Sequence, residues 1–421
     1  MTLRFGFPAM RAKVNSFITL GRAAHQFLQL RFVAKVRLKW VKNRALDHII
    51  DIQTDVKAAW MLKNAIKRSP TGYITEKTVT NWKRDLGLTV PVVRFLRRYP
   101  TMFKEFPHAR YPSLPCFKLT DIGQMLDSQE QEIYQNSEKE IVDRVTRFIM
   151  MMKTKTVPFQ TLYPLKWDLG LPDNFDRILI PKYPGRFEVV KSPTGLPCLR
   201  LLQWEDDLAM SALQRNIQSK QYSEEYRMFK SGHTALTFPM KFPKGYGGMN
   251  KVKAWMNQFH EMPYISPYED ATGIDPNSDL MEKRVVGVLH EVLSLTIHKK
   301  TWRDYLRRLR EELILPERFT RIFTRYPGIF YLSLKCKTTT VALREGYEKG
   351  KLVNPHPLAT LRWKMHHVMR TGLLYRERGI ARITASEMQT QLEDDCNYDN
   401  DGGISEEEEE VEIETDDEIS D

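Results

Sequence analysis

One short motif occurs three times in this chain and constrains its architecture more than any other feature. The copies are Tyr99-Pro100-Thr101-Met102-Phe103, Tyr183-Pro184-Gly185-Arg186-Phe187 and Tyr326-Pro327-Gly328-Ile329-Phe330. A residue before proline is pushed out of the α region, so a helix must end at each tyrosine. A leucine-containing turn and a proline precede each copy, at 86–91, 169–172 and 313–316. Because proline suits the first turn of a helix, each copy predicts a turn followed by a short helix.

Strand-like runs follow each copy of the motif. The clearest hairpin joins 187–190 to 198–202 through the turn 192–195, and similar pairs join 103–106 to 116–119 and 330–334 to 340–343. An apolar helix is predicted upstream of each unit, at 56–66, 141–152 and 285–297. Helix, helix, short helix and hairpin is the order of a winged helix-turn-helix. Three αα-hairpins with incidental strands are the alternative.

The predicted fold class is therefore mainly α with short β-hairpins (α+β), in three divergent winged-helix-like units in tandem. The spacing between the motif tyrosines, 84 and then 143 residues, argues against a regular solenoid. A long insert stands before the third unit. The predicted divisions are a transit peptide at 1–44, unit one at 45–120, a linker at 121–139, unit two at 140–204, the insert at 205–283, unit three at 284–375 and a disordered acidic tail at 376–421.

Charge is distributed unevenly along the chain. Residues 393–421 contain 16 Asp and Glu and no Lys or Arg. The other 392 residues carry all 64 basic side chains and only 37 acidic ones, a net of +27. So basic a body favours a polyanionic partner such as RNA or DNA over a merely solvated surface. The tail is too polar to bury a core, which predicts disorder.

The first 44 residues have the composition of an organelle-targeting segment. They contain ten Lys or Arg and no acid, and the first acidic residue is Asp47. Arginine-rich, acid-free segments are typical of transit peptides, and the single serine favours the mitochondrion over the chloroplast. A basic RNA-binding arm that stays attached is the alternative.

Basic side chains recur on one side of particular predicted helices. In unit one, Val92, Phe95 and Leu96 should face the core and leave the nearby arginines outside. In unit three, Phe319, Ile322 and Phe323 should do the same. Guanidinium groups suit phosphates because each can donate two hydrogen bonds. The predicted RNA-binding residues are Lys77, Lys83, Arg84, Arg94, Arg97, Arg98, Arg303, Arg307, Arg308, Arg318, Arg321, Arg325, Lys335 and Lys337.

Each of these residues could instead belong to an ordinary solvated helix face, and their clustering is more specific than any one of them. Unit two differs, because Asp173 and Asp176 nearly cancel Arg177 on its short helix. We therefore interpret unit two as a structural spacer. Units one and three are the predicted RNA-facing units.

No catalytic or metal-binding constellation is evident in the sequence. The four cysteines form no CxxC pair, and His366-His367 has no Cys or carboxylate at metal spacing. The glycine-rich run at 245–248 lacks the Lys-Ser/Thr of a phosphate loop. No run of about 18 apolar residues is present. The sequence thus predicts a protein that is not an enzyme and needs no metal or cofactor.

Three stretches resemble one known family. They are 47–63, which begins Asp47-His48-Ile49-Ile50-Asp51; 238–270, which contains Pro263-Tyr264-Ile265-Ser266-Pro267-Tyr268-Glu269-Asp270; and the third Tyr-Pro motif with Tyr331. Over residues 40–375 the chain resembles the plant organelle RNA recognition (PORR) domain family. The resemblance implies an organellar protein that binds intron RNA, promotes group II intron splicing and works with other splicing factors.

Three hypotheses remain open on the sequence alone. The first is the splicing factor, in the mitochondrion or alternatively the chloroplast. The second is an organellar DNA-binding regulator, because winged helices usually read duplex DNA. The third is a hydrolase, for which no nucleophile is visible. Within 263–270 the closely spaced prolines and tyrosines favour a locked loop, although Tyr264 or Tyr268 could stack on a base.

Overall fold

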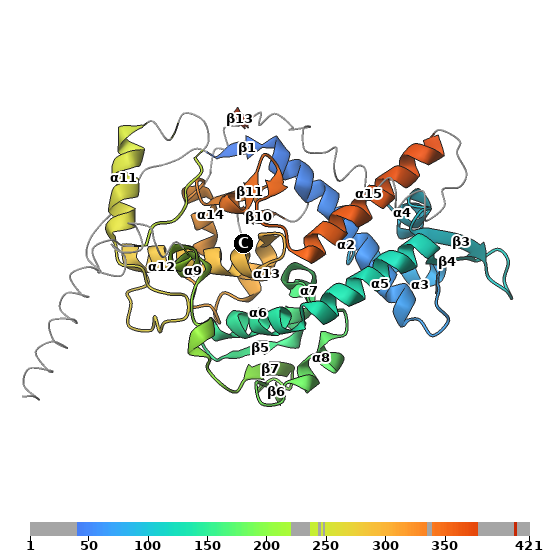
Figure 1. Ribbon diagram of the computed structural model, residues 1–421, viewed down its shortest axis with the longest axis horizontal. Helices are drawn as coiled ribbons and strands as arrows, with labels where there is room; N and C mark the ends of the chain where they lie inside the picture. The colour runs from blue at the N-terminus through green and yellow to red at the C-terminus, as the bar shows by residue number, and fades with distance from the viewer. Residues whose placement is uncertain are drawn as a thin grey trace, which may run out of the picture.

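The structure is a computed structural model that describes residues 40–219, 236–242, 246, 249–334, 339–377 and 408–410. Helices predominate, and the strands form small antiparallel sheets of two or three strands. The α+β class expected from the sequence is therefore confirmed. Figure 1 shows the first repeat at the right, the second at the bottom and the third near the centre.

Three sheets share one topology, in which the last strand of a hairpin lies between its partner and a short earlier strand. The strand orders are β2-β4-β3, β5-β7-β6 and β8-β10-β9. The bounds are β2 Ile74–Thr75, β3 Phe103–Pro107, β4 Pro115–Leu119, β5 Thr156–Pro158, β6 Phe187–Lys191, β7 Pro197–Leu201, β8 Lys300–Trp302, β9 Phe330–Ser333 and β10 Thr340–Leu343. We refer to the segments around these sheets as units one, two and three.

Each unit places its helices in the same order around its sheet. A long helix comes first, a short helix follows the first strand, and another short helix precedes the hairpin. The long helices are α2 Arg44–Arg68, α6 Glu138–Met150 and α12 Asp279–Leu295. The second helices are α3 Glu76–Val79 with the 3-10 turn η1 Thr80–Lys83, α7 Phe159–Leu169 and α13 Arg303–Arg308. The third are α4 Val92–Arg98, α8 Phe175–Ile178 with η2 Ile180–Lys182, and η4 Phe319–Arg321 with α14 Ile322–Arg325.

The motif tyrosine fastens the third helix of each unit to the first. In every unit its hydroxyl donates a hydrogen bond to an acidic side chain on the long helix. The pairs are Tyr99 with Asp55 at 2.6 Å, Tyr183 with Glu138 at 3.0 Å, and Tyr326 with Glu282 at 2.7 Å. Burial, together with these carboxylates, raises the pKa of all three tyrosines. The repeated motif therefore ends the third helix and also bonds it, through the tyrosine hydroxyl, to the first helix of the unit.

The leucine-containing turns predicted before each short helix are also observed, and they share one backbone geometry. The middle residue is left-handed in each, with φ of +70° at Gly87, +66° at Gly170 and +54° at Ile314. The following leucine donates its N–H to a carbonyl five residues back, at 2.8–3.0 Å. This pattern ends a helix with a left-handed residue, a position that favours glycine.

The described residues form two large hydrophobic cores and a small third one, in which Leu46 and Ile50 of α2 pack against Tyr331, Ala342 and Tyr347. The largest contains residues of units two and three and of the insert, including Phe175, Leu289 and Phe323. The second belongs to unit one and is closed by helix α15 (Pro357–Glu377) through Val368 and Met369. Figure 1 shows α15 lying along α2. Trp167 of α7 joins the second core, so unit two also contacts unit one.

The segment predicted as a linker at 121–139 is mostly helical. Helix α5 (Asp121–Asn136) begins after Thr120, whose side chain accepts the N–H of Gly123 at 3.0 Å. It joins units one and two as a helix, and most of its polar residues form an outward face. Two of its acids point inward and are neutralised by the buried Lys63, which donates to Asp127 at 2.5 Å and to Glu130.

The insert at 205–283 contains the 3-10 turn η3 (Asp206–Leu208) and the helices α9 (Ala212–Gln218) and α11 (Asn250–Glu261). Between unit three and α15 lie the 3-10 turn η5 (Arg344–Gly346) and the two-stranded sheet of β11 (Tyr347–Glu348) and β12 (Lys351–Leu352). Gly245 and its glycine neighbours at 247–248 lie outside the described residues.

The ends of the chain depart from the predicted divisions at a few residues. Most of the predicted transit peptide lies outside the described residues, but its last five residues belong to the folded body. The indole of Trp40 donates to the carbonyl of Leu332 at 2.9 Å and stacks on Tyr331. Most of the predicted disordered tail is likewise outside. However, α15 runs to Glu377, and β13 (Glu408–Glu410) pairs antiparallel with β1 (Val41–Asn43).

Candidate nucleic-acid interface

The short helix α4 of unit one has the two faces that its sequence predicts. Val92, Phe95 and Leu96 are buried, and the three arginines Arg94, Arg97 and Arg98 are exposed. Helix α4 is only seven residues long, so its arginines lie close together at one end of the unit. The apolar periodicity therefore oriented this helix correctly.

The three arginines of α4 are not equivalent. Arg97 makes a two-pronged contact with Glu105 of β3, through Nε to Oε2 at 2.9 Å and Nη2 to Oε1 at 2.7 Å. These hydrogen bonds raise the pKa of Arg97 and lower that of Glu105. Arg94 and Arg98 have no acidic partner within the described ranges. They remain the arginines of α4 that can meet a phosphate directly.

The second helix of unit one adds three exposed basic residues beside α4. Lys77 lies on α3, Lys83 ends η1 and Arg84 follows it, and all three are exposed. None of them has an acidic partner in the part of the chain that the structure describes. Unit one thus presents five basic side chains free for an anion, all of them predicted.

The third helix of unit three also buries its apolar side and exposes basic residues. Phe319, Ile322 and Phe323 are buried, whereas Arg318 and Arg321 are exposed. The predicted stripe stops there, because Arg325 donates from Nη1 to Glu282 of α12 at 2.6 Å. Glu282 lies 43 positions earlier and also binds the motif tyrosine, so sequence spacing within the helix could not reveal this pairing.

The other basic residues predicted in unit three differ in how far they are exposed. Arg307 and Arg308 are exposed on α13. Arg303 is half-buried, and burial lowers its pKa. The side chains of Lys335 and Lys337 lie outside the described residues. Arg307, Arg308 and Arg318 are therefore the clearest candidates of unit three.

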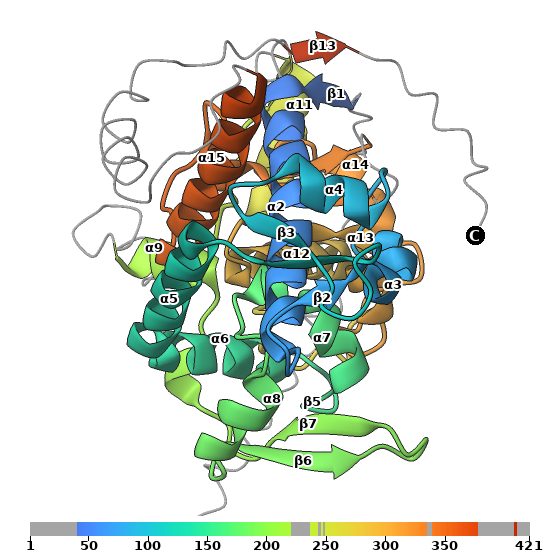
Figure 2. The same cartoon turned by 90° about the vertical axis from the view of Figure 1, so that its right-hand side faces the viewer.

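Units one and three touch directly, which the sequence did not predict. The ammonium of Lys57 on α2 lies 4.2 Å from the centre of the Trp302 ring in β8. A Cβ at Gly87 would lie 3.7 Å from the same ring. Figure 2 shows α3, α4, α13 and α14 toward the right-hand side of the molecule. We call the exposed basic residues of these elements the basic face: Lys77, Lys83, Arg84, Arg94, Arg98, Arg307, Arg308 and Arg318.

Unit two pairs the corresponding charges internally. Asp173 binds Lys166 of α7, and Asp176 accepts the hydroxyl of Tyr163 at 2.9 Å. Lys182 contacts Glu138 of α6 at 2.6 Å. The exposed Arg177 is the exception, so unit two offers a phosphate fewer open basic groups than unit one, and its role as a spacer stays a prediction.

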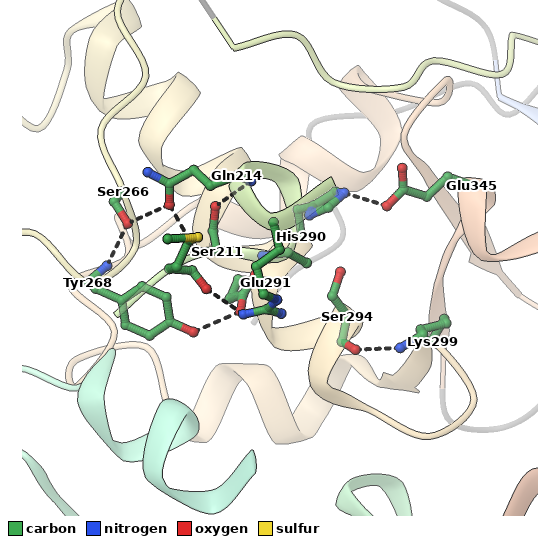
Figure 3. Close-up of polar contacts among 12 residues, drawn as sticks. Ser211, Gln214, Ser266, Tyr268, His290, Glu291, Ser294, Lys299 and Glu345 are labelled. Atoms are coloured by element: carbon green, nitrogen blue, oxygen red, sulfur yellow. Dashed lines mark hydrogen bonds and ion pairs between the residues drawn. The ribbon is translucent and has the colours of Figure 1, made fainter. Parts of the chain in front are cut away.

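The middle of the segment 263–270 is buried, at residues 265–268, whereas Glu269 and Asp270 are exposed. Tyr268 donates to the fully buried Glu291 of α12 at 2.7 Å, and Tyr264 donates to the hydroxyl of Ser211 at 2.9 Å. Figure 3 shows Tyr268 pointing toward Glu291, and Gln214 of α9 bonded to Ser266. Because Tyr268 is buried and the Tyr264 hydroxyl is engaged, a base-stacking role for either is not supported. The segment locks the insert onto α12.

Comparison with known proteins places the chain in a family. The sequence profile described as "Plant organelle RNA recognition domain" matches residues 41–374. The chain belongs to this family. The match starts one residue after Trp40, the first residue that the structure describes. The prediction drawn from the residues at 47–63, 238–270 and 326–331 is therefore confirmed.

This member of the plant organelle RNA recognition family has curated relatives along most of its length. It is 33% identical over 358 residues to Protein WHAT'S THIS FACTOR 9, mitochondrial, of Arabidopsis thaliana, covering 85% of this chain and 91% of that protein. It is 31% identical over 389 residues to Protein WHAT'S THIS FACTOR 1, chloroplastic, of Zea mays, covering 89% and 76%. It is 26% identical over 338 residues to Protein ROOT PRIMORDIUM DEFECTIVE 1 of Arabidopsis thaliana, covering 77% and 81%. No solved structure matches the chain.

Two further observations describe this family member. Among the described residues, no group of three or more His, Cys, Asp or Glu is arranged to hold a metal ion. No helix in the described ranges combines the length and apolar character needed to cross a bilayer. The site is therefore a charged surface without a constellation of metal ligands in the described part of the chain.

Proposed function

We propose that this protein binds organellar intron RNA through the basic face and promotes group II intron splicing. Membership of a family named for plant organelle RNA recognition carries the proposal. The basic face supports it, because its eight side chains have no acidic partners within the described ranges. Such a surface gains affinity for RNA by displacing counterions from phosphates. The protein would act by holding RNA structure rather than by chemistry of its own, together with other splicing factors.

We further propose that the three units are winged-helix modules and that α4 and the η4–α14 segment are the recognition helices of units one and three. The support is the shared order of first helix, strand, second helix, third helix and hairpin, with the same strand arrangement in each sheet. In winged helix-turn-helix proteins the helix before the hairpin enters a groove. The arginines of α4 lie on the helix before the hairpin, which is the helix that would enter the groove.

The proposed location is the mitochondrion. The acid-free, arginine-rich composition of residues 1–44 supports import into an organelle. The Arabidopsis relative WHAT'S THIS FACTOR 9 is named mitochondrial, whereas the maize relative WHAT'S THIS FACTOR 1 is named chloroplastic. The chloroplast is therefore the other location to test, by imaging the full chain with a C-terminal fluorescent tag.

Sequencing of RNA that co-purifies with the protein from isolated organelles tests the function. Group II intron fragments should be enriched over exons, transfer RNA and ribosomal RNA. In vitro, unlabelled intron RNA should displace labelled intron RNA where duplex DNA of equal length does not. Equal displacement by duplex DNA would support a DNA-binding regulator instead. Intact RNA after long incubation with magnesium would exclude a nuclease.

A further inference from the structure

The hairpin of unit one ends in a stack of aromatic side chains. Tyr111, at the tip, is 62% exposed, and its ring stacks on His108 with centroids 5.6 Å apart and planes at 26°. His108 meets the edge of Tyr73 at 6.2 Å, and Tyr73 meets Phe106 edge-on at 5.3 Å. The stack therefore runs from the sheet to an exposed ring. Figure 1 shows this hairpin, β3 and β4, projecting at the right-hand end of the molecule.

Hydrogen bonds fix the backbone under this stack. The N–H of His108 donates to the carbonyl of Leu114 at 3.1 Å, and Leu114 donates to the carbonyl of Tyr111 at 2.9 Å. The N–H of Arg110 donates to Nδ1 of His108 at 3.2 Å. Because Nδ1 is the acceptor, the neutral imidazole carries its proton on Nε2. The His108 ring is held in place in this way, and it supports the Tyr111 ring that stacks on it. A supported ring loses little conformational entropy when a base stacks on its other face.

One cross-strand position distinguishes this hairpin from the other two. In unit two the position is filled by the opposite charges Glu188 and Arg200, 3.7 Å apart, and in unit three by Tyr331 and Ala342, both buried. In unit one it is filled by Lys104 and Lys118, both exposed. Like charges directly opposite each other on a sheet are destabilising. An anion between them would relieve that repulsion.

The rest of the hairpin adds positive charge and no free acid. Residues 103–119 contain one acidic residue, Glu105, and Arg97 already neutralises it. Arg110 stands beside Tyr111 at the tip and, like the two lysines, has no acidic partner among the residues described. The ammonium of Lys118 lies 5.8 Å from the centre of the Phe106 ring, so the lysines line the same hairpin as the aromatic stack. An exposed aromatic ring together with cations that lack acidic partners is the combination that binds single-stranded nucleic acid.

We propose that the hairpin of unit one is a binding site for single-stranded RNA. An unpaired base stacks on Tyr111 at the tip, and a phosphate farther along the same RNA strand lies between Lys104 and Lys118, whose register places them at least four residues nearer the foot of the hairpin. The bound RNA must be single-stranded, because a base within a duplex is stacked on both faces and has no free face for Tyr111. The proposal rests on the proposed RNA binding and adds a second contact to the basic face, one that recognises unpaired segments of the intron.

The test compares the full chain with Tyr111→Ala and Tyr111→Phe. The probe is a labelled 15-nucleotide oligouridine, measured by fluorescence anisotropy, beside an RNA duplex of equal length. Stacking contributes about 1–3 kcal/mol per base, so Tyr111→Ala should weaken oligouridine binding by about 5- to 150-fold. Tyr111→Phe keeps the ring and should bind within about twofold of wild type. Duplex binding should be unchanged in both variants.

Two further variants separate stacking from charge and from location. Lys118→Gln should lower the slope of log affinity against log salt by about 0.7, the value for one lost phosphate contact on a single strand. Leu196→Ala changes a side chain that is 43% exposed at the tip of the unit-two hairpin, and it should have no effect. Circular dichroism of each variant confirms its fold.

The outcomes distinguish this proposal from the function on which it rests. If Tyr111→Ala binds oligouridine like wild type while the wild type binds intron RNA, the hairpin site is overturned and the basic face stands. If Tyr111→Ala and Tyr111→Phe weaken single strand and duplex equally, the hairpin touches the backbone only and the stacking proposal is wrong. If wild type binds neither RNA at low salt, the proposed function itself fails.

Discussion

Replacing Arg94 and Arg98 together by Gln should weaken RNA binding without unfolding the protein. Both side chains are exposed on α4 and have no acidic partner in the described part of the chain. Exposed substitutions of this kind usually change the free energy of unfolding by less than about 0.5 kcal/mol. A loss of affinity would therefore report lost phosphate contacts rather than lost structure.

The magnitude follows from the number of contacts removed. If each arginine meets one phosphate on a single strand, the slope of log affinity against log salt should fall by about 1.4. A tenfold rise in salt would then reduce wild-type affinity by about 25-fold more than it reduces the affinity of the variant. The assay is anisotropy with labelled intron RNA at four salt concentrations. Arg307→Gln with Arg318→Gln is the equivalent change in unit three.

Two control variants are matched to this change. Arg97→Gln with Glu105→Gln removes an ion pair from the same surface and leaves the net charge unchanged. Exposed pairs contribute only about 0.2–1 kcal/mol, so its fold and its salt slope should be nearly those of wild type. Arg177→Gln with Lys182→Gln removes two charges from unit two, where Lys182 already has an acidic partner.

The ordering of the variants decides whether α4 faces RNA. The Arg94 and Arg98 variant should be damaged most among those that alter units one and two. If the unit-two variant loses as much affinity, the positive charge acts diffusely and α4 is not a recognition helix. If every variant binds like wild type, the main contact lies outside the basic face.

Three further predictions follow from other parts of the molecule. Deleting 393–421 should tighten RNA binding at low salt, with the gain shrinking as salt rises, because the acidic tail pairs with β1 and competes for basic residues; unchanged affinity would contradict this. Deleting 1–39 should abolish organelle import and leave RNA binding intact, whereas a deletion to residue 44 would also remove Trp40 from Tyr331. Burial lowers the pKa of Lys283 from 10.5 to about 7. The unfolded chain therefore binds more protons between those pH values, and stability rises with pH across that window. Lys283→Met should remove up to about 1.4 kcal/mol of that rise per pH unit in urea unfolding.

Local patterns in the sequence predicted the features that depend on neighbours along the chain. The helix end at each Tyr-Pro step is a steric effect of the next residue, and it is found at Tyr99, Tyr183 and Tyr326. Helical spacing likewise assigned Phe95 and Phe323 to the core. These predictions succeeded because the forces involved act within a few residues.

Contacts between distant segments could not be predicted in this way. Arg97 and Arg325 look like their exposed neighbours in the sequence, but each meets a carboxylate that only the folded chain brings near. The contact between Lys57 and Trp302 has the same origin. The hairpin site was missed for another reason, because its signal lies in the comparison of Lys104 and Lys118 with the equivalent pairs, and strand register was needed to align them.

The three turns before the short helices show how tertiary contact limits a local rule. Their left-handed middle residue favours glycine, and two copies have it. The third has Ile314, a β-branched residue in a conformation that such residues rarely adopt. The left-handed backbone therefore does not by itself demand glycine in this fold. The side chains packed against each turn must therefore determine whether glycine is required there.

Gly87→Ala and Gly170→Ala test that conclusion as a matched pair. Both residues are left-handed, which should cost alanine about 1–2 kcal/mol at either position. A Cβ at Gly87 would meet Trp302 at 3.7 Å, an ordinary contact, but at Gly170 it would lie 2.7 Å from Ile297 and 3.0 Å from Arg144. Overpacking adds about 1–3 kcal/mol, so Gly170→Ala should lower the free energy of unfolding by clearly more than Gly87→Ala in urea titrations. Equal losses would mean that backbone conformation alone sets the requirement, and that the side chains of Ile297 and Arg144 move away from the added methyl group.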